Sequence, residues 1–357
     1  MATDDKNSSP PEDRMAGKRE IGKSGLAVPA LGNGTQAWGD KRFGYGTAYN
    51  RDDLYAIYTT CLDAGLNFFD TSDTYGRGRA EELLGEFHRR DGRPITVATK
   101  FTQAKIYDPN LNFSLKAVST VLDRSLTKLG QDSIDLYQLH YPPVRRKLDS
   151  YLDAMAETVK SGKVKAVGVS NFSTGYMRHS HEYLAKQHGI TLASNQVGFN
   201  LLHRHPESNG MLTACRELGV TILPILPLAE GVLTGKYRVG GPEYTGPQGT
   251  LFRGASLFEP GESFFKAMRS KPYEMHREEL ESLFDVMNEI AQEHDATIAQ
   301  VALNWLVATD PLVIPIPGAK SASQVRSNAA ALSWTMTAEE YSRLSQTEAA
   351  IRESLGF

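Results

Sequence analysis

Four residues in the first half of the chain have the types needed to pass a proton to an oxygen: Asp70, Tyr75, Lys100 and His140. A tyrosine hydroxyl has a pKa of about 10, too high for ready proton exchange at neutral pH. A nearby lysine cation would lower that pKa, and a carboxylate would keep the lysine charged and oriented. An imidazole would hydrogen-bond a substrate carbonyl and help to place it. Together the four would form a proton donor that quenches an alkoxide as it forms.

The elements that must position these residues follow a regular rhythm. From about residue 50 the chain repeats a helical pattern, a short apolar strand and a polar loop, which indicates βαβ units and a parallel sheet. Eight strands are counted if VPALGNGT (28–35) is the first, which predicts a closed (β/α)8 TIM barrel. An open doubly wound sheet is the alternative, but LGNGTQ lacks the G-x-G-x-x-G spacing and no helix directly follows it.

Polar residues mark the ends of the predicted strands. In a (β/α)8 barrel the carboxyl ends of the strands face one shared site. One polar strand end is unremarkable, since it is as readily the entry to a solvated loop. Six in register argue for a site: Asp70, Lys100, His140, Ser170-Asn171, Asn195-Gln196 and Gly318-Ala319-Lys320.

Three segments stand outside the repeat. REIGKSGLAVPAL (19–31) is typical of a hairpin with its turn at Lys23-Ser24-Gly25, placed to close the barrel bottom. Residues 236–277, after the seventh strand, form a long Gly-, Pro- and aromatic-rich loop, and such loops are more often functional than idle. An extra C-terminal helix follows the barrel, with Thr337 as N-cap and Glu340 completing a capping box.

The bulk properties narrow the function class. The chain has 357 residues, of which 40% are hydrophobic. Its net charge of -3 does not indicate a basic surface for binding nucleic acid. No apolar run is long enough to span a membrane. The two cysteines, Cys61 and Cys215, predict no disulfide framework. Residues 1–18 are predicted to be a disordered tail before a single domain at 19–357, and the expected location is cytoplasmic.

From about residue 19 onward the sequence resembles the aldo-keto reductase superfamily. The likeness rests on FFDTSDTYGRGRAEELLGEF, VATKF, DLYQLH, AVGVSNF, NQVGFNLL, GVLTGKY and QVALNWLVATDPLVIPIPGAKSASQVRSN, all in order. It implies a (β/α)8 barrel that binds NADPH at its C-terminal mouth and transfers a hydride to the carbonyl carbon of a small-molecule aldehyde or ketone. Tyr75 would be the general acid, Asp70 and Lys100 its tuning pair, and His140 the residue that orients the substrate.

The resemblance also implies the cofactor and substrate contacts. Ser170, Asn171 and Gln196 would hold the nicotinamide carboxamide, Lys320 and Ser321 the 2′-phosphate, and Gln324 and Asn328 the adenine. A lysine and a serine entering a helix N-terminus make a sound phosphate site independently of any family. The LTGKY segment would pass near the pyrophosphate. The remaining expected cofactor residues are Gly34, Thr35, Ile225, Leu228, Gly235, Lys236 and Gly318, and the expected substrate residues are Trp38 and Tyr141.

Some positions depart from the family pattern. Ile225 stands where a tyrosine stacks on the nicotinamide, Leu226 where a serine helps to hold the cofactor, and Gln36 where tryptophan is common.

Two other groups of polar residues are given no functional role. Glu81 and Glu82 are interpreted as a solvated helix face. No metal site is predicted, because the paired histidines near 180 and 204 lack a surrounding ligand cluster.

Two other functions stay open at this stage. One is a cofactor-binding regulatory or redox-sensing subunit with slow catalysis, and the complete set of four residues speaks against it. The other is a different barrel enzyme, such as a metal-dependent hydrolase, which the missing ligand cluster disfavours. The sequence does not identify the substrate, the pathway, the preferred direction of reaction or the oligomeric state.

Overall fold

The computed structural model describes residues 17–102, 115–242 and 277–354 of the chain. Seven parallel strands form one curved sheet in which spatial order follows chain order. Sequential neighbours pair directly because each strand is followed by a crossover that returns to the same end of the sheet. The strands are β3 (Asn33–Gly34), β4 (Phe68–Asp70), β5 (Thr96–Phe101), β6 (Ile134–Leu139), β7 (Val164–Ser170), β8 (Leu192–Gly198) and β9 (Thr221–Ile225).

Residues 312–318 close the ring between β9 and β3. The amides of Ile314 and Ile316 donate to β9, and the carbonyls of Pro315 and Pro317 accept amide bonds from the segment that contains β3. Proline has no N–H, so the contact with β3 has only half of a regular ladder. For that reason the segment is joined by isolated bridges rather than by a continuous strand. The predicted (β/α)8 fold is confirmed.

An antiparallel hairpin closes the N-terminal end of the barrel, as predicted. Strand β1 (Arg19–Glu20) pairs with β2 (Ala27–Val28). Ile21 and Val28 are fully buried and pack in an apolar cluster with residues of the barrel strands, among them Phe68, Ala98 and Leu136. The prediction of one strand over 28–35 was wrong at its start, because Val28 pairs within the hairpin and the barrel strand covers only β3.

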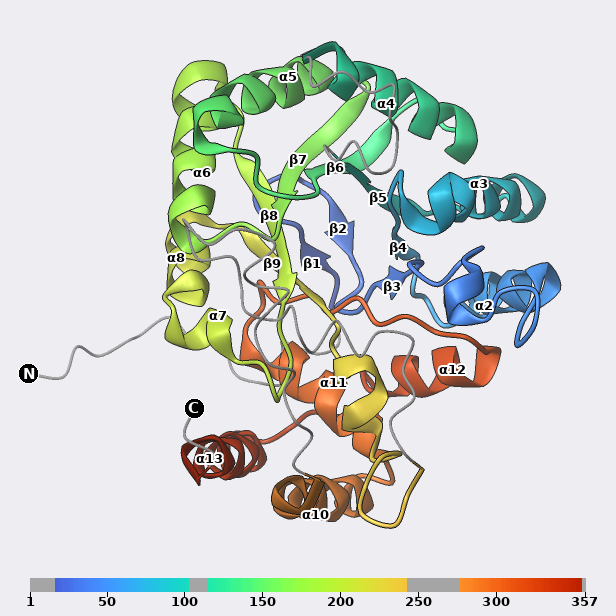
Figure 1. The fold of residues 1–357 in the computed structure, drawn as a ribbon, viewed down its shortest axis with the longest axis vertical. Helices are drawn as coiled ribbons and strands as arrows, with labels where there is room; N and C mark the ends of the chain where they lie inside the picture. Colours follow the sequence, from blue (N-terminus) through green and yellow to red (C-terminus); the bar gives the residue numbers. More distant parts are fainter. Residues whose placement is uncertain (1–16, 103–114, 243–276, 355–357) are drawn as a thin grey trace, which may run out of the picture.

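Helices surround the sheet (Figure 1). They are α2 (Arg51–Asp63), α3 (Arg79–Asp91), α4 (Leu115–Leu129), α5 (Leu148–Lys160), α6 (Thr174–His188), α7 (His205–Ser208), α8 (Met211–Leu218), α10 (Arg277–Glu293), α11 (Ile298–Thr309), α12 (Ala322–Ala330) and α13 (Ala338–Ser354). Helix α12 packs on α2 and completes the outer ring, while α10 and α13 pack on each other outside it. The described ranges also contain four short 3-10 turns, η1 (Lys41–Phe43), η2 (Tyr75–Gly78), η3 (Arg145–Lys147) and η4 (Ala229–Thr234).

The predicted C-terminal capping box is confirmed. The Thr337 amide donates to Glu340 Oε2 at 2.6 Å, and the Glu340 amide donates to Thr337 Oγ1 at 3.2 Å. These two bonds satisfy donors that the first helical turn leaves without intrahelical acceptors. They fix the start of α13.

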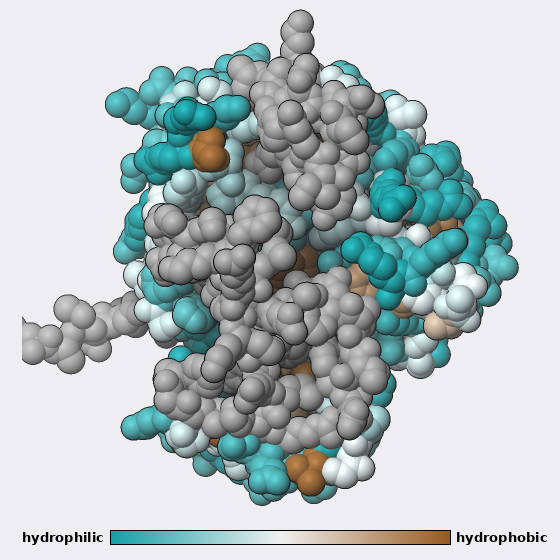
Figure 2. All heavy atoms as spheres, viewed as in Figure 1, coloured by the Kyte–Doolittle hydropathy of each residue, from teal (hydrophilic) through white to brown (hydrophobic). Residues whose placement is uncertain are grey.

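Several predictions concern segments outside the described residues. The tail at 1–16 and most of the 236–277 loop, from 243 to 276, belong to them. Within the described parts, no helix has the length and apolar character to cross a membrane. The described surface on the face in Figure 2 is mostly hydrophilic. The cytoplasmic location and the absence of nucleic-acid binding stay predictions.

Candidate active site

Lys100 joins Asp70 and Tyr75 at the carboxyl end of the sheet. Its Nζ donates to Asp70 Oδ1 at 2.6 Å, to the Thr71 carbonyl at 2.8 Å and to the Tyr75 hydroxyl oxygen at 3.1 Å. The lysine is fully buried and the Asp70 side chain is 3% exposed. Strands β4 and β5 bring the pair together, since parallel pairing sets Asp70 beside Ala98, two residues before Lys100. The pairing of β4 with β5 therefore fixes the contact between Lys100 and Asp70.

Two glutamines hold the other oxygen of Asp70. Gln196 Nε2 on β8 donates to Asp70 Oδ2 at 2.8 Å, and Gln138 Nε2 on β6 donates to the same atom at 3.4 Å. These hydrogen bonds fix the orientation of the Asp70 carboxylate. The sequence reasoning missed Gln138. It stands two residues before His140, so it lies on the same face of its strand, and that spacing was the available signal.

A left-handed turn presents Tyr75. In η2 the next two residues, Gly76 and Arg77, have φ values of 55° and 59°. At Gly76 this conformation needs glycine for a second reason, because a Cβ there would lie 2.8 Å from the Trp38 carbonyl oxygen. The Tyr75 amide donates to the Ser72 carbonyl at 3.2 Å and ties the turn to the end of β4. The Gly-Arg-Gly sequence thus aims the tyrosine hydroxyl at Lys100.

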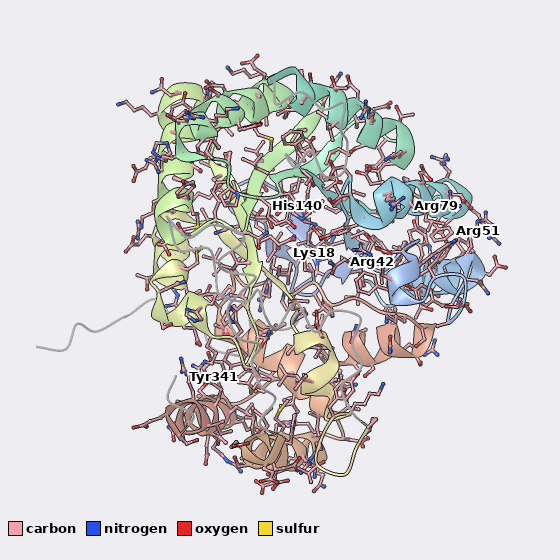
Figure 3. All side chains as sticks on the ribbon, in the orientation of Figure 1. Lys18, Arg42, Arg51, Arg79, His140 and Tyr341 are labelled. Atoms are coloured by element: carbon pink, nitrogen blue, oxygen red, sulfur yellow. The ribbon has the colours of Figure 1, made fainter. Side chains whose placement is uncertain are left out.

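His140 lies beside the tyrosine, directly after β6. Its ring is edge-on to Tyr75 with centroids 5.9 Å apart, and it stacks on Tyr141 at 4.4 Å. Its Nδ1 lies 2.7 Å from Thr102 Oγ1 and 3.3 Å from Ser72 Oγ. Figure 3 labels His140 within the ring of strands. The structure therefore brings all four predicted proton-transfer residues together.

The electrostatics of Tyr75 differ from the expectation that a lysine lowers its pKa. Burial, followed by the carboxylates of Asp70 and Asp73, raises the pKa of Tyr75 well above its usual value. Burial also lowers the pKa of Lys100, with Asp70 opposing it. The physical reason is that burial removes the water that would stabilise a phenolate. Burial thus favours the protonated phenol of Tyr75, which is the form that the predicted general acid would require.

Glu81 is buried, so its interpretation as part of a solvated face was wrong. The residue is 0% exposed, and Thr99 Oγ1 donates to its Oε1 at 2.7 Å. Lys128 Nζ on α4 lies 3.7 Å from its Oε2. Burial raises the pKa of Glu81 above its usual value. Only Glu82 lies on the outer face, where it pairs with Arg79 at 2.9 Å.

The residues expected near a nicotinamide lie together at the ends of β7 and β8. Ser170 Oγ donates to the Gln196 carbonyl at 3.1 Å. Asn171 Nδ2 donates to the His140 carbonyl and to Ser170 Oγ, each at 3.1 Å. The Gln196 side-chain nitrogen donates to the Asp70 carboxylate in this structure, which differs from the predicted contact with a nicotinamide carboxamide. On the other side of Asp70, the Thr35 amide and hydroxyl both donate to the Asp70 carbonyl at 2.9 Å, and Gly34 bridges to Gly318.

The residues expected to hold phosphate and adenine lie at the start of α12. Ser321 is the N-cap, and its Oγ accepts from the Gln324 amide at 3.2 Å. Gln324 Oε1 accepts from the Lys320 amide at 2.7 Å. The Lys320 side chain is exposed, with Nζ 5.9 Å from the ring centroid of Phe43, whereas Asn328 is 7% exposed. An exposed lysine beside a capped helix N-terminus suits a phosphate group.

The segment after β9 carries the remaining expected cofactor residues. Ile225 ends β9, and the Leu228 carbonyl accepts amide bonds from Gly231 and Leu233 in η4. Gly235 has a φ of 74°, and Lys236 Nζ lies 5.3 Å from the ring centroid of Tyr237. Leu226, at the departure from the family pattern, has a φ of 54°. A branched side chain in this left-handed region is strained.

The two expected substrate residues differ in position. Tyr141 stacks on His140 and is only partly buried, which suits a place at the site. Trp38 is 1% exposed, and its ring packs edge-on against Phe69 and Phe87 in the layer between the sheet and the helices. The structure thus does not place Trp38 at the substrate mouth. The large apolar ring is accommodated in the core instead.

Among the described residues, no group of three or more His, Cys, Asp or Glu side chains is arranged to hold a metal ion. His179, one of the residues considered for that role, has its Nε2 2.5 Å from Asp149 Oδ1. That arrangement is a surface pair between helices α5 and α6.

Comparison with known proteins decides the family. The sequence model of the aldo/keto reductase family matches residues 30–349. The chloroplastic pyridoxal reductase of Arabidopsis thaliana is 34% identical over 345 residues, covering 92% of this chain and 85% of that protein. The chain belongs to the aldo/keto reductase family.

Other aldo/keto reductases are similar over most of their length. The L-glyceraldehyde 3-phosphate reductase of Escherichia coli O157:H7 is 31% identical, covering 92% of this chain and 91% of that protein. An aldo-keto reductase from Klebsiella pneumoniae, solved in complex with NADPH, is 25% identical with a TM-score of 0.68. It covers 93% of this chain and 95% of its own. The similarity therefore includes the barrel as a whole and is not confined to one motif.

Proposed function

We propose that this aldo/keto reductase reduces the carbonyl group of a small aldehyde or ketone to an alcohol with NADPH, and that Tyr75 delivers the proton. One observation carries the proposal: Lys100 Nζ is within hydrogen-bond distance of both Asp70 Oδ1 and the Tyr75 hydroxyl, at 2.6 and 3.1 Å. A positioned acid with an oriented cation beside it is what protonation of a developing alkoxide requires.

Each of the four residues has a defined part. Tyr75 holds its proton because burial raises its pKa, and it releases that proton only to a strong base such as an alkoxide. Lys100 stabilises the tyrosinate that is left. Asp70, held by Gln196 and Gln138, keeps Lys100 in place. His140 and Tyr141 border the position of the carbonyl.

The residues present fit an NADPH molecule. Ser170 and Asn171 offer hydroxyl and amide groups beside the four residues, and Lys320 and Ser321 offer a cation and a capped helix N-terminus for the 2′-phosphate. NADPH supplies the hydride when bound. An NADPH-bound aldo-keto reductase of similar fold supports this cofactor.

The test is multiple-turnover oxidation of NADPH by the full chain with a panel of aldehydes and ketones. The panel includes pyridoxal and L-glyceraldehyde 3-phosphate, the compounds in the names of two relatives. We expect turnover with at least one member. Tyr75→Phe should bind NADPH normally in a fluorescence titration and lose about 10²- to 10⁴-fold in rate, the usual contribution of a general acid. Near-native turnover by this variant would refute the role of Tyr75.

A further inference from the structure

A series of hydrogen bonds connects the Asp73 carboxylate, through the Thr102 hydroxyl, to Nδ1 of His140. Asp73 Oδ1 accepts from Thr102 Oγ1 at 2.7 Å, and Thr102 Oγ1 lies 2.7 Å from His140 Nδ1. Ser72 forms a longer parallel link, 3.0 Å to Asp73 Oδ1 and 3.3 Å to the same ring nitrogen. The Thr102 amide donates to Asp73 Oδ2 at 3.2 Å. In the proton transfer described above, Thr102 has no part and Asp73 contributes only through its charge, which helps to raise the pKa of Tyr75.

The number of protons shared by Asp73, Thr102 and His140 restricts which ring nitrogen of His140 can be protonated. Burial and the nearby Lys100 charge hold the pKa of His140 well below its usual value, so the ring is neutral and carries one proton. Thr102 also has a single hydroxyl proton. If that proton goes to an ionised Asp73, the Thr102 oxygen must accept from His140, and the ring proton is on Nδ1. If Asp73 is protonated, it donates to Thr102, which then donates to Nδ1, and the ring proton is on Nε2.

We infer that Asp73, acting through Thr102, determines which nitrogen of His140 carries the ring proton, and hence whether Nε2 accepts or donates a hydrogen bond at the substrate. This inference rests on the proposed carbonyl reduction. With the proton on Nε2, His140 donates to a carbonyl oxygen and helps to bind the oxidised substrate. With the proton on Nδ1, Nε2 accepts instead and suits an alcohol. Asp73 and Thr102 are positioning residues, since neither touches the reacting atoms.

The surroundings of Asp73 allow both states. Burial raises the pKa of Asp73 above its usual value, while the bonds from Thr102 and Ser72 and the charge of Lys128 lower it. Other titratable groups also interact with Asp73: Glu81 on α3, Lys100 on β5, Tyr75 in η2 and Tyr137 on β6. Asp73 is therefore expected to titrate closer to neutral pH than a free aspartate does.

Asp73→Asn offers a sharp test because the backbone fixes its orientation. The Thr102 amide donates to the Oδ2 position, so an asparagine must place its oxygen there and its NH2 group where Oδ1 was. The NH2 group then donates to Thr102, whose hydroxyl proton turns to His140 Nδ1. The variant should hold the ring proton on Nε2 at every pH at which the ring is neutral.

The experiment reads the ring nitrogens of His140 by NMR in the full chain labelled with 15N-histidine, with the signal assigned by loss in His140→Gln. At pH 8 we expect the proton on Nδ1 in the wild type and on Nε2 in Asp73→Asn. Thr102→Ser should match the wild type. In a Thr102→Val background, Asp73→Asn should move the proton much less. The same ring tautomer in wild type and Asp73→Asn, or an undiminished shift without the Thr102 hydroxyl, would overturn the inference.

Kinetics supply an independent readout. For carbonyl reduction at pH 8, Asp73→Asn should lower KM by about tenfold, as one added hydrogen bond to the carbonyl allows, with kcat within about threefold. The wild-type KM should fall towards the variant's as pH is lowered to 5. If the two residues only stabilised the loop, thermal stability would change while the tautomer and the pH profile of KM did not. Because the spectra need no substrate, they decide this inference even if the chain reduces none of the carbonyls offered.

Discussion

Strand β5 separates two lysine–carboxylate pairs, of which one is buried and the other has a partly exposed lysine. On its inner face Lys100 contacts Asp70 at 2.6 Å inside the barrel. On its outer face the preceding residue, Thr99, donates to Glu81, which lies 3.7 Å from Lys128 in the layer beneath α3 and α4. Neighbouring residues of a strand point to opposite faces. A single step along β5 thus separates the proposed proton-transfer site from a contact between the strand and the helices.

The two pairs differ in what surrounds them. Asp70 has Gln196 and Gln138 on its second oxygen, and its lysine reaches a tyrosine hydroxyl. Lys128 is 28% exposed, and a Cβ on Gly78 would overlap its ammonium group. The outer pair lies beside the turn that carries Tyr75, while the lysine of the inner pair contacts the tyrosine hydroxyl. The difference shows that burial of a charged pair does not by itself indicate catalysis.

The same substitution at Lys100 and at Lys128 should give the largest difference in kcat. Lys100→Met should lower kcat for carbonyl reduction by about 10²- to 10⁴-fold, because the tyrosinate loses its stabilising cation. The matched control, Lys128→Met, should keep kcat within about threefold, since its ammonium does not reach the tyrosine. Steady-state NADPH oxidation on both folded variants measures this. Equal losses would mean that both pairs act on Tyr75.

At the outer pair, substitution of the lysine should change stability while leaving turnover nearly unchanged. Lys128→Met should lower the free energy of unfolding by about 1–3 kcal/mol at pH 8, less than for a fully buried pair because Lys128 is partly exposed. The folded-state pKa of Glu81 is already raised, and loss of the cation raises it further. An acid with a raised folded pKa stabilises the fold at low pH and loses that contribution as pH rises through the folded pKa.

The deficit should therefore be smaller at pH 5 than at pH 8. Urea denaturation of wild type and variant at the two pH values measures it. Glu81→Gln is a second check: with no carboxyl group to titrate, its stability should lose this part of the pH dependence. A deficit in Lys128→Met that grows as pH falls would contradict the raised folded-state pKa of Glu81.

Lys320 is exposed and belongs to neither pair, so its substitution should affect cofactor binding and not turnover. Lys320→Ala should weaken NADPH binding by roughly 1.5–3 kcal/mol, the value of a charge-assisted hydrogen bond, and should leave NADH binding nearly unchanged. Lys320 has no share in the buried pairs, so kcat at saturating cofactor should stay near the wild-type value. Fluorescence titration with the two cofactors measures the difference. Equal losses for NADPH and NADH would show that Lys320 does not contact the 2′-phosphate.

Much of the fold and of the four-residue set was open to prediction because both depend on local pattern. Helix and strand periods recur along the chain, and a parallel barrel gathers its strand ends at one face. Residues such as Asp70, Lys100 and His140 are therefore placed together once the strands are counted. The first strand was misplaced because VPALGNGT is apolar throughout its first half, so nothing local shows where the hairpin ends and the barrel begins.

The sequence by itself determined the order of elements, the polar strand ends, the capping box of α13 and the family. Only the tertiary structure decided the burial of Glu81 and Trp38, the clamp of Gln138 and Gln196 on Asp70, and the raised pKa of Tyr75. The physical reason is the same in each case. Burial and hydrogen-bond partners depend on residues that are distant in the sequence, as in the hydrogen bond from Gln196 to Asp70. Neither the spacing of residues nor the composition shows which of these residues come into contact.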